Sequence, residues 1–183
     1  MKKLLVGAAV LAAFIGAAPV AQAQSTSSTQ YGISGGLTLP IGDFGNGYGS
    51  GLNVQGHISA KPGSSPFTLR GDVGLWTLGG KSVNVGGISG SNDGRTLFTV
   101  SGNAVYPFEG AKDATFVPYV IGGAGIYTGN QGFGTKFGVN AGGGITFKLA
   151  GFDAFTEARF HNIFGDGGSA RIIPISFGVL FRP

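Results

Sequence analysis

The stretch RIIPISFGVLF, residues 171–181, decides the fold of this chain. Every second residue from Ile173 to Phe181 is large and apolar, whereas the residues between them are mostly small or weakly polar. A period of two predicts a β-strand with one continuous apolar face. Because this strand stands near the C-terminus of a chain that begins with an apolar leader, we expect the face to contact lipid rather than a soluble core.

Seven further segments alternate in the same way over roughly ten residues each, the length at which a tilted strand crosses a bilayer. In most of them one face carries Phe, Ile, Leu or Val, and the other carries Ser, Thr, Asn or Gly. The sequence therefore predicts about eight membrane-length strands. The other seven are residues 31–39, 52–60, 67–77, 96–106, 116–127, 135–149 and 154–163.

The segment 116–127 has the least decisive alternation. Large apolar side chains suit lipid, and small residues suit a narrow interior. We therefore expect Tyr119, Ile121 and Tyr127 to point outward, and Gly122 and Ala124 to point inward.

The connections between these segments differ in length on the two sides of the predicted structure. Short turns on one side and longer loops on the other are typical of barrels with periplasmic termini and extracellular loops. The short turns are residues 61–66, 108–115 and 150–153, and the longer loops include residues 41–51 and 78–95. We interpret the glycine-rich loop 41–51 as flexible, with Phe44 and Tyr48 as aromatic residues at the interface or in surface contacts.

The composition excludes several classes of protein. Glycine accounts for 37 of 183 residues, about a fifth against a usual share of about 7%. Only 11% of residues are charged and 42% are hydrophobic, which is the opposite of a disordered chain. Cysteine is absent, which excludes disulfides and thiolate metal sites. No run of Lys or Arg follows the leader, so nucleic acid is excluded as a partner.

The first 23 residues have the pattern of a secretory signal peptide. Lys2 and Lys3 precede an apolar stretch, and Ala21-Gln22-Ala23 supplies a small-residue cleavage site. We predict a signal peptide over residues 1–23 and a barrel domain over residues 24–183. An uncleaved helical anchor is the alternative, because the apolar stretch approaches the length that spans a membrane.

The polar faces of the strands indicate which side meets water. They carry mainly Gly, Ser, Thr and Asn, with few of the charged residues that make an exterior soluble. Such faces suit a narrow interior. We therefore predict an all-β fold, a closed antiparallel up-and-down transmembrane β-barrel of eight strands, because closure pairs the strand edges that lipid cannot satisfy. A secreted soluble barrel with its apolar face inward is the alternative.

Four features make the chain resemble the small outer-membrane β-barrel domain family of Gram-negative bacteria, which includes OmpA-like and OmpX-like proteins. They are the leader that ends at Ala23, the LPIGDFG of residues 39–45, the PYVIGGAG of residues 118–125 and the alternating terminal strand. The resemblance covers the mature chain and marks a fold rather than an activity. It implies an outer-membrane location and insertion by the barrel-assembly machinery, which reads a terminal aromatic residue; here Arg182 and Pro183 follow Phe181.

Charged and imidazole side chains fall on the predicted inward faces. An eight-stranded barrel leaves an interior that side chains fill, and charges in such a lumen must be paired. We expect a hydrogen-bonded polar network in the lumen, with a narrow ion path through the same residues as the alternative. Its members are His57, Arg70, Asp72, Lys136, Lys148, Glu157, Arg159 and His161.

An enzyme is a further alternative. Barrel deacylases of lipid A resemble a barrel with a His, a Ser two residues later and a Glu on a nearby strand. This chain has His161 but Ile163 where that Ser would stand, and Ser176 would have to approach His161 across the last hairpin. Glu157 and His161 share a face but make neither a metal site nor a triad. We predict no catalytic residues, cofactor or metal.

The sequence thus predicts a non-enzymatic barrel in the outer membrane that contributes to envelope structure or to surface contact through extracellular loops. Its expected partners are outer-membrane lipids, the barrel-assembly machinery and an unidentified extracellular partner. A narrow channel or solute-transport barrel and a lipid-modifying enzyme are the alternatives.

Overall fold

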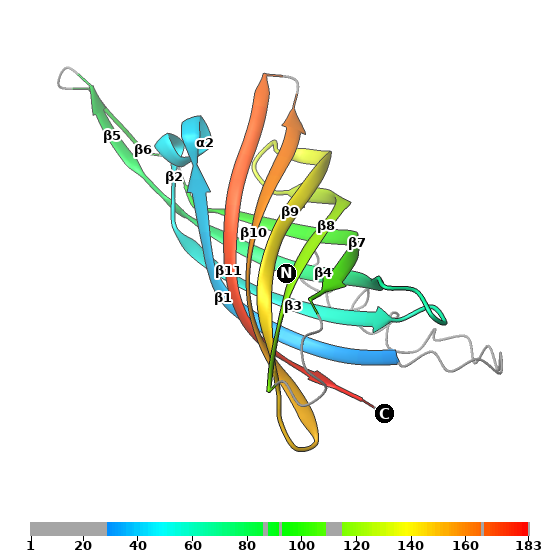
Figure 1. Ribbon diagram of the computed structural model, residues 1–183. Coiled ribbons are helices and arrows are strands. Elements are labelled where there is room, and N and C mark those ends of the chain that lie inside the picture. Colours follow the sequence, from blue (N-terminus) through cyan, green and yellow to red (C-terminus); the bar gives the residue numbers. More distant parts are fainter. Residues whose placement is uncertain (1–28, 86–87, 92, 109–114, 166, 183) are drawn as a thin grey trace, which may run out of the picture.

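A computed structural model describes residues 29–85, 88–91, 93–108, 115–165 and 167–182 (Figure 1). The predicted signal peptide and the polar lead after it lie outside the described residues. Within those residues no helix has the length and apolarity needed to span a membrane.

Eight long strands form a closed antiparallel barrel, as predicted. Each strand pairs with its neighbour along the chain, the last strand pairs with the first, and the pairing of β4 with β7 completes the circle. The strands are β1 (Thr29–Ile41), β3 (Gly51–Ala60), β4 (Thr68–Gly80), β7 (Arg95–Pro107), β8 (Phe116–Gly129), β9 (Gly134–Lys148), β10 (Phe152–Gly165) and β11 (Gly168–Phe181).

The two long connections contain more structure than the sequence predicted. Between β1 and β3 the chain forms a helical turn, α2 (Gly42–Gly47), and a short strand, β2 (Tyr48–Gly49), which pairs with the end of β4. Between β4 and β7 it forms a hairpin of β5 (Ser82–Val85) and β6 (Ile88–Ser91). In Figure 1 this hairpin projects beyond the barrel, on the side of α2. We call this side the loop end, and the opposite side, where β1 begins and β11 finishes, the terminal end.

The loop after β1 folds onto the barrel, which corrects the interpretation of residues 41–51 as a flexible surface loop. Phe44 and Tyr48 are partly buried and pack against side chains inside the barrel at its loop end. Their rings lie 4.9 Å apart. Burial of these two rings explains why the segment turns inward, since exposed aromatic surface is costly in water.

The barrel exterior is a belt of exposed apolar side chains. On β11, Phe177 is 67% exposed, whereas Ser176 and Ile172 on the other face are buried, as predicted from the opening stretch. A soluble monomer rarely exposes an apolar surface this extensive, so the belt is the surface that meets lipid. Other members of the belt are Ile33, Leu37, Leu52, Val54, Ile58, Leu69, Leu75, Val100, Phe116, Val120, Ile126, Phe137, Phe147 and Phe160.

The predicted facing of the fifth strand was wrong. Tyr119, Ile121 and Tyr127 of β8 point inward, with exposed fractions of 6%, 3% and 0%. Gly122 and Ala124 share the face of the exposed Val120 and Ile126. Both faces of this strand carry apolar residues, so hydrophobic period alone could not assign them.

Interior glycines make room for the large side chains that fill the barrel. A Cβ at Gly142 would lie 2.8 Å from Cγ of Arg159, and one at Gly144 would lie 2.5 Å from the Tyr119 hydroxyl. A Cβ at Gly178 would lie 2.5 Å from the ring of Phe155. Real side chains do not approach so closely, and close packing of this kind is a usual reason for glycine in a strand. The unusual glycine content is therefore partly a consequence of a filled lumen.

We predict that Gly144→Ala destabilises the barrel. The new Cβ would lie 2.3 Å from the Thr156 carbonyl oxygen and 2.5 Å from the Tyr119 hydroxyl, and overpacking costs about 1–3 kcal/mol. Urea unfolding in detergent micelles, followed by the fluorescence of Trp76, the single Trp of the chain, measures the effect.

Gly56→Ala is the matched control, because nothing lies within 4 Å of a Cβ at that exterior position. We expect its free energy of unfolding to stay within about 0.5 kcal/mol of wild type, with a slight gain from a stiffer unfolded chain. Equal stability of the two variants would contradict the filled-lumen interpretation.

Candidate functional site

The loop end of the lumen is closed by a cluster of buried apolar side chains, which we call the apolar plug. It consists of Trp76, Leu78, Leu97, Tyr127, Phe133, Ile163 and Ile172. Phe44, Tyr48 and Ala170 pack against it. The Arg95 guanidinium lies over the rings of Tyr48 and Phe133, 5.0 and 5.1 Å from their centroids. An apolar constriction of this kind disfavours a continuous column of water.

Below the plug, four buried charges form an ionic cluster of Arg70, Asp72, Glu157 and Arg159. Asp72 lies 3.0 Å from Arg70 Nε and 2.8 Å from Arg159 Nη1. Glu157 Oε1 lies 2.8 Å from both Arg70 Nη2 and Arg159 Nε. Each carboxylate therefore contacts both guanidinium groups, and the cluster is neutral as a whole. This arrangement satisfies the requirement that buried charges be paired, although Arg70 Nε meets Asp72 without the geometry of a hydrogen bond.

Neutral polar groups complete the hydrogen bonds of the ionic cluster. The Tyr119 hydroxyl donates to Glu157 over 2.7 Å, and Asn103 Nδ2 donates to Asp72 over 2.8 Å. Arg159 also donates to Gln55 Oε1 over 3.3 Å. Sequence reasoning did not single out these three neutral side chains. Gln55 and Asn103 were on the polar faces of their segments, but Tyr119 was assigned to the outside.

The structure brings together five of the eight residues expected in the lumen network. These are the four members of the ionic cluster and His57, whose Nδ1 lies 2.7 Å from Asp72 Oδ1. His161 lies apart, in the plug, where Nδ1 is 2.7 Å from the Tyr127 hydroxyl and the imidazole meets Trp76 edge to face.

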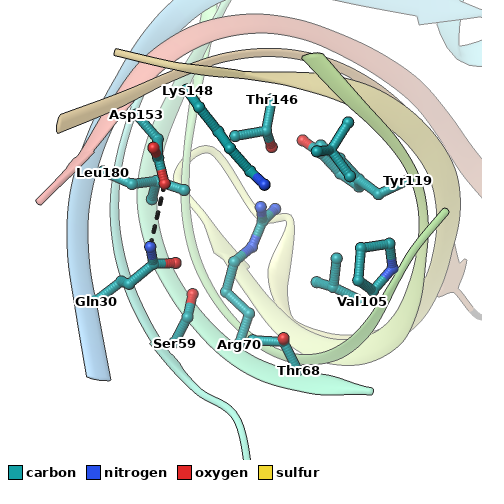
Figure 2. A pocket seen from close by; sticks show the side chains of 12 residues that line it. Gln30, Ser59, Thr68, Arg70, Val105, Tyr119, Thr146, Lys148, Asp153 and Leu180 are labelled. Atoms are coloured by element: carbon teal, nitrogen blue, oxygen red, sulfur yellow. Dashed lines mark hydrogen bonds between the residues drawn. The ribbon is translucent and has the colours of Figure 1, made fainter. Parts of the chain in front are cut away.

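The two lysines occupy opposite ends of the barrel. Lys136 is at the loop end, with its ammonium 5.7 Å from the centroid of the Phe133 ring. Lys148 is exposed at the terminal end, where it lines a cavity with Arg70 and Asp153 (Figure 2). Neither lysine belongs to the ionic cluster.

A chain of hydrogen bonds through His57 has the atom order of a serine hydrolase triad. Ser34 Oγ lies 2.7 Å from His57 Nε2, and His57 Nδ1 lies 2.7 Å from Asp72. Asp72 can accept from Nδ1–H as a carboxylate, and a ring with its proton on Nδ1 would accept from Ser34 at Nε2. Ser34 was not among the residues expected in the site, and only its place on the polar face of the first strand marked it.

The surroundings of this array differ from those of a hydrolase. Ser34 is 4% exposed and does not line the cavity at the terminal end. Phe155 covers His57, with ring centroids 5.5 Å apart. Asp72 also contacts both arginines. A nucleophile must reach its substrate, and Ser34 is sealed in the lumen.

The pairing of His161 with Ser176 that a deacylase would need is absent. Ser176 faces Glu157 across the β10–β11 pair, and its hydroxyl donates to Asn53 over 2.9 Å. His161 faces Ile172 and contacts Tyr127 instead. Among the described residues, no group of three or more His, Asp or Glu side chains is placed to hold a metal ion.

We predict that Asp72→Asn destabilises the barrel by about 3–5 kcal/mol, because the change leaves two buried guanidinium groups with one carboxylate. Urea unfolding in micelles measures the loss. Asp43→Asn, on the exposed side of α2, removes the same charge and should change stability by less than about 0.5 kcal/mol. Unfolding of Asp72→Asn at the wild-type urea concentration would show that the ionic cluster does not stabilise the fold.

No family model and no curated protein sequence matches the chain. Several solved structures, however, are similar to the chain. Neisserial surface protein A (NspA) is similar over 86% of this chain and 99% of that one, at 15% identity and a TM-score of 0.65. OprG, an outer membrane protein from Pseudomonas aeruginosa, is similar over 87% of this chain and 99% of its own, at 12% identity and a TM-score of 0.59. The outer membrane enzyme PagL is similar over 84% of this chain and 99% of its own, at 17% identity and a TM-score of 0.51.

These likenesses are likenesses of fold, and they confirm the resemblance that the sequence suggested. The exposed apolar belt independently requires lipid around the barrel. The chain therefore has the fold of the small eight-stranded outer-membrane β-barrels, with an apolar exterior suited to lipid.

Proposed function

We propose that the protein is a non-enzymatic outer-membrane barrel that contributes to envelope structure or to surface contact through its loop end. The observation that carries this proposal is the filled lumen: the ionic cluster is neutral and fully paired, and the apolar plug closes the barrel above it. A lumen of this kind holds the barrel rigid and leaves the loop end as the part able to contact other molecules.

The proposed orientation has the terminal end in the periplasm and the loop end outside the cell. It is supported by the greater size of the loop-end connections, which include α2 and the β5–β6 hairpin (Figure 1), since extracellular loops are the longer ones in such barrels. In this proposal residues 1–23 are removed as a signal peptide, the barrel-assembly machinery inserts the domain, and lipids surround the belt. The extracellular partner would meet α2 and the hairpin.

A narrow channel is disfavoured by the apolar plug. We predict that the folded protein gives no step conductance in planar bilayers, because ions would have to pass buried Trp76, Leu97 and Tyr127. A general porin reconstituted in the same way is the positive control. Discrete, reproducible steps that require the folded form of the protein would replace the structural role with a transport role.

A hydrolase is the second candidate, favoured by the Ser34–His57–Asp72 array and by the fold shared with PagL. We predict that a fluorophosphonate probe does not label the folded protein, because Ser34 is 4% exposed and its partner His57 is covered by Phe155. Labelling is read by mass spectrometry on wild type and Ser34→Ala, with PagL as the enzyme of the same fold for comparison. Label on the wild type that is lost in Ser34→Ala would overturn the non-enzymatic proposal.

A further inference from the structure

The terminal end of the barrel opens into a vestibule. Its cavity has a volume of about 160 Å³ and is lined by side chains from all eight barrel strands. The cavity has room for several water molecules, and therefore for a small solute. Because the ionic cluster and the plug close the lumen above it, the vestibule is a dead-end pocket rather than the mouth of a pore.

Two cationic side chains face each other across the vestibule. Figure 2 shows the Lys148 ammonium and the Arg70 guanidinium pointing toward one another in the middle of the pocket. Arg70 contacts Asp72 and Glu157 through Nε and Nη2, and Nη1 takes part in none of these contacts. The Lys148 ammonium makes no hydrogen bond or ion pair within the described part of the chain.

The nearby carboxylates already have cationic partners. Asp72 and Glu157 contact Arg70 and Arg159 in the ionic cluster. Asp153, on the vestibule wall, accepts hydrogen bonds from Gln30 and from Arg182, with which it forms an ion pair. Asp153 stands directly opposite Lys148 on the neighbouring strand, but its ion pair is with Arg182, so Lys148 forms no ion pair with a carboxylate of the described vestibule wall.

The chemistry of the pocket fits an oxyanion. The charge of Lys148 raises the positive potential in a pocket with protein walls and attracts anions. Arg70, although its charge is balanced in the ionic cluster, directs its guanidinium into the same space. Arg70 Nη1 and the Lys148 ammonium offer only hydrogen-bond donors. The hydroxyls of Ser59, Thr68 and Thr146, which also line the pocket, add donors. Charge-assisted hydrogen bonds to carboxylate or phosphate oxygens are among the strong ones.

We propose that the vestibule binds one small oxyanion, a phosphate or a carboxylate, between Lys148 Nζ and Arg70 Nη1. The anion compensates the charge of Lys148 and bridges β4 to β9. The closed upper wall limits the ligand to the size of a single phosphate or a short carboxylic acid. The site faces the periplasm in the proposed orientation, and its occupancy does not depend on conductance or on loop contacts.

The test measures binding of inorganic phosphate to the folded protein in maltoside micelles, by equilibrium dialysis with radiolabelled phosphate. We expect saturable binding of one phosphate per chain that weakens as ionic strength rises. Lys148→Gln should weaken the affinity about tenfold or more, because it removes a charge-assisted bond. Lys148 is exposed and has no described partner to lose, so the variant should fold, which heat-modifiable gel migration checks.

Lys61→Gln is the matched control, because Lys61 follows β3 at the same end of the barrel and does not line the cavity. Its affinity for phosphate should stay within about twofold of wild type. Absence of saturable binding, or equal loss of affinity in Lys61→Gln and Lys148→Gln, would overturn the proposal.

A second arm identifies the source of the anion. The same titration in nanodiscs that contain phosphatidylglycerol tests whether a lipid headgroup fills the vestibule. If inorganic phosphate still binds in these nanodiscs, the ligand of the vestibule is a soluble anion. Loss of binding in these nanodiscs, with recovery in nanodiscs of a neutral lipid that has no phosphate in its headgroup, would show that the headgroup phosphate occupies the vestibule.

Discussion

Charge pairing in a narrow lumen is the constraint on which the rest of this structure depends. The outside of the barrel is apolar, so every charge on the strands must lie inside or at an end. Asp72 and Glu157 each contact Arg70 and Arg159, which gives a closed set of pairs drawn from β4 and β10. These strands lie on opposite sides of the barrel, because they are four places apart in the circle of eight strands. The ionic cluster therefore ties the two sides together through the lumen, as well as through the circle of backbone hydrogen bonds.

Glycine supplies the space that this arrangement needs. Guanidinium and phenol groups are large, and an eight-stranded barrel is narrow. Gly142 lies where a Cβ would meet Arg159, and Gly144 where it would meet Tyr119. The polar network and the glycine content are thus two aspects of one packing solution. This relation also helps to explain why a chain with so much glycine has long, regular strands, because interior glycines such as Gly142, Gly144 and Gly178 face side chains that fill the space they leave.

The lumen is different at its two ends, and this difference separates the functional proposals. The apolar plug excludes water at the loop end, where α2 packs over it. The vestibule at the terminal end is open and carries Lys148, which forms no ion pair with a carboxylate of the described vestibule wall. The middle of the lumen holds the Ser34–His57–Asp72 array. Its two hydrogen bonds are short, but Ser34 is buried and a substrate could not reach it. Geometry alone would suggest catalysis at Ser34, and burial argues for a structural role.

The sequence by itself determined that the strands exist, how many there are and which face of most of them meets lipid, because a period of two is a local property of the chain. It also placed Arg70, Asp72, Glu157 and Arg159 on inward faces. Only the tertiary structure decided which of these charges meet, since their contacts join strands that are distant in the chain and depend on barrel closure and register. The same holds for Tyr119, whose inward position follows from the space at Gly144 on the next strand.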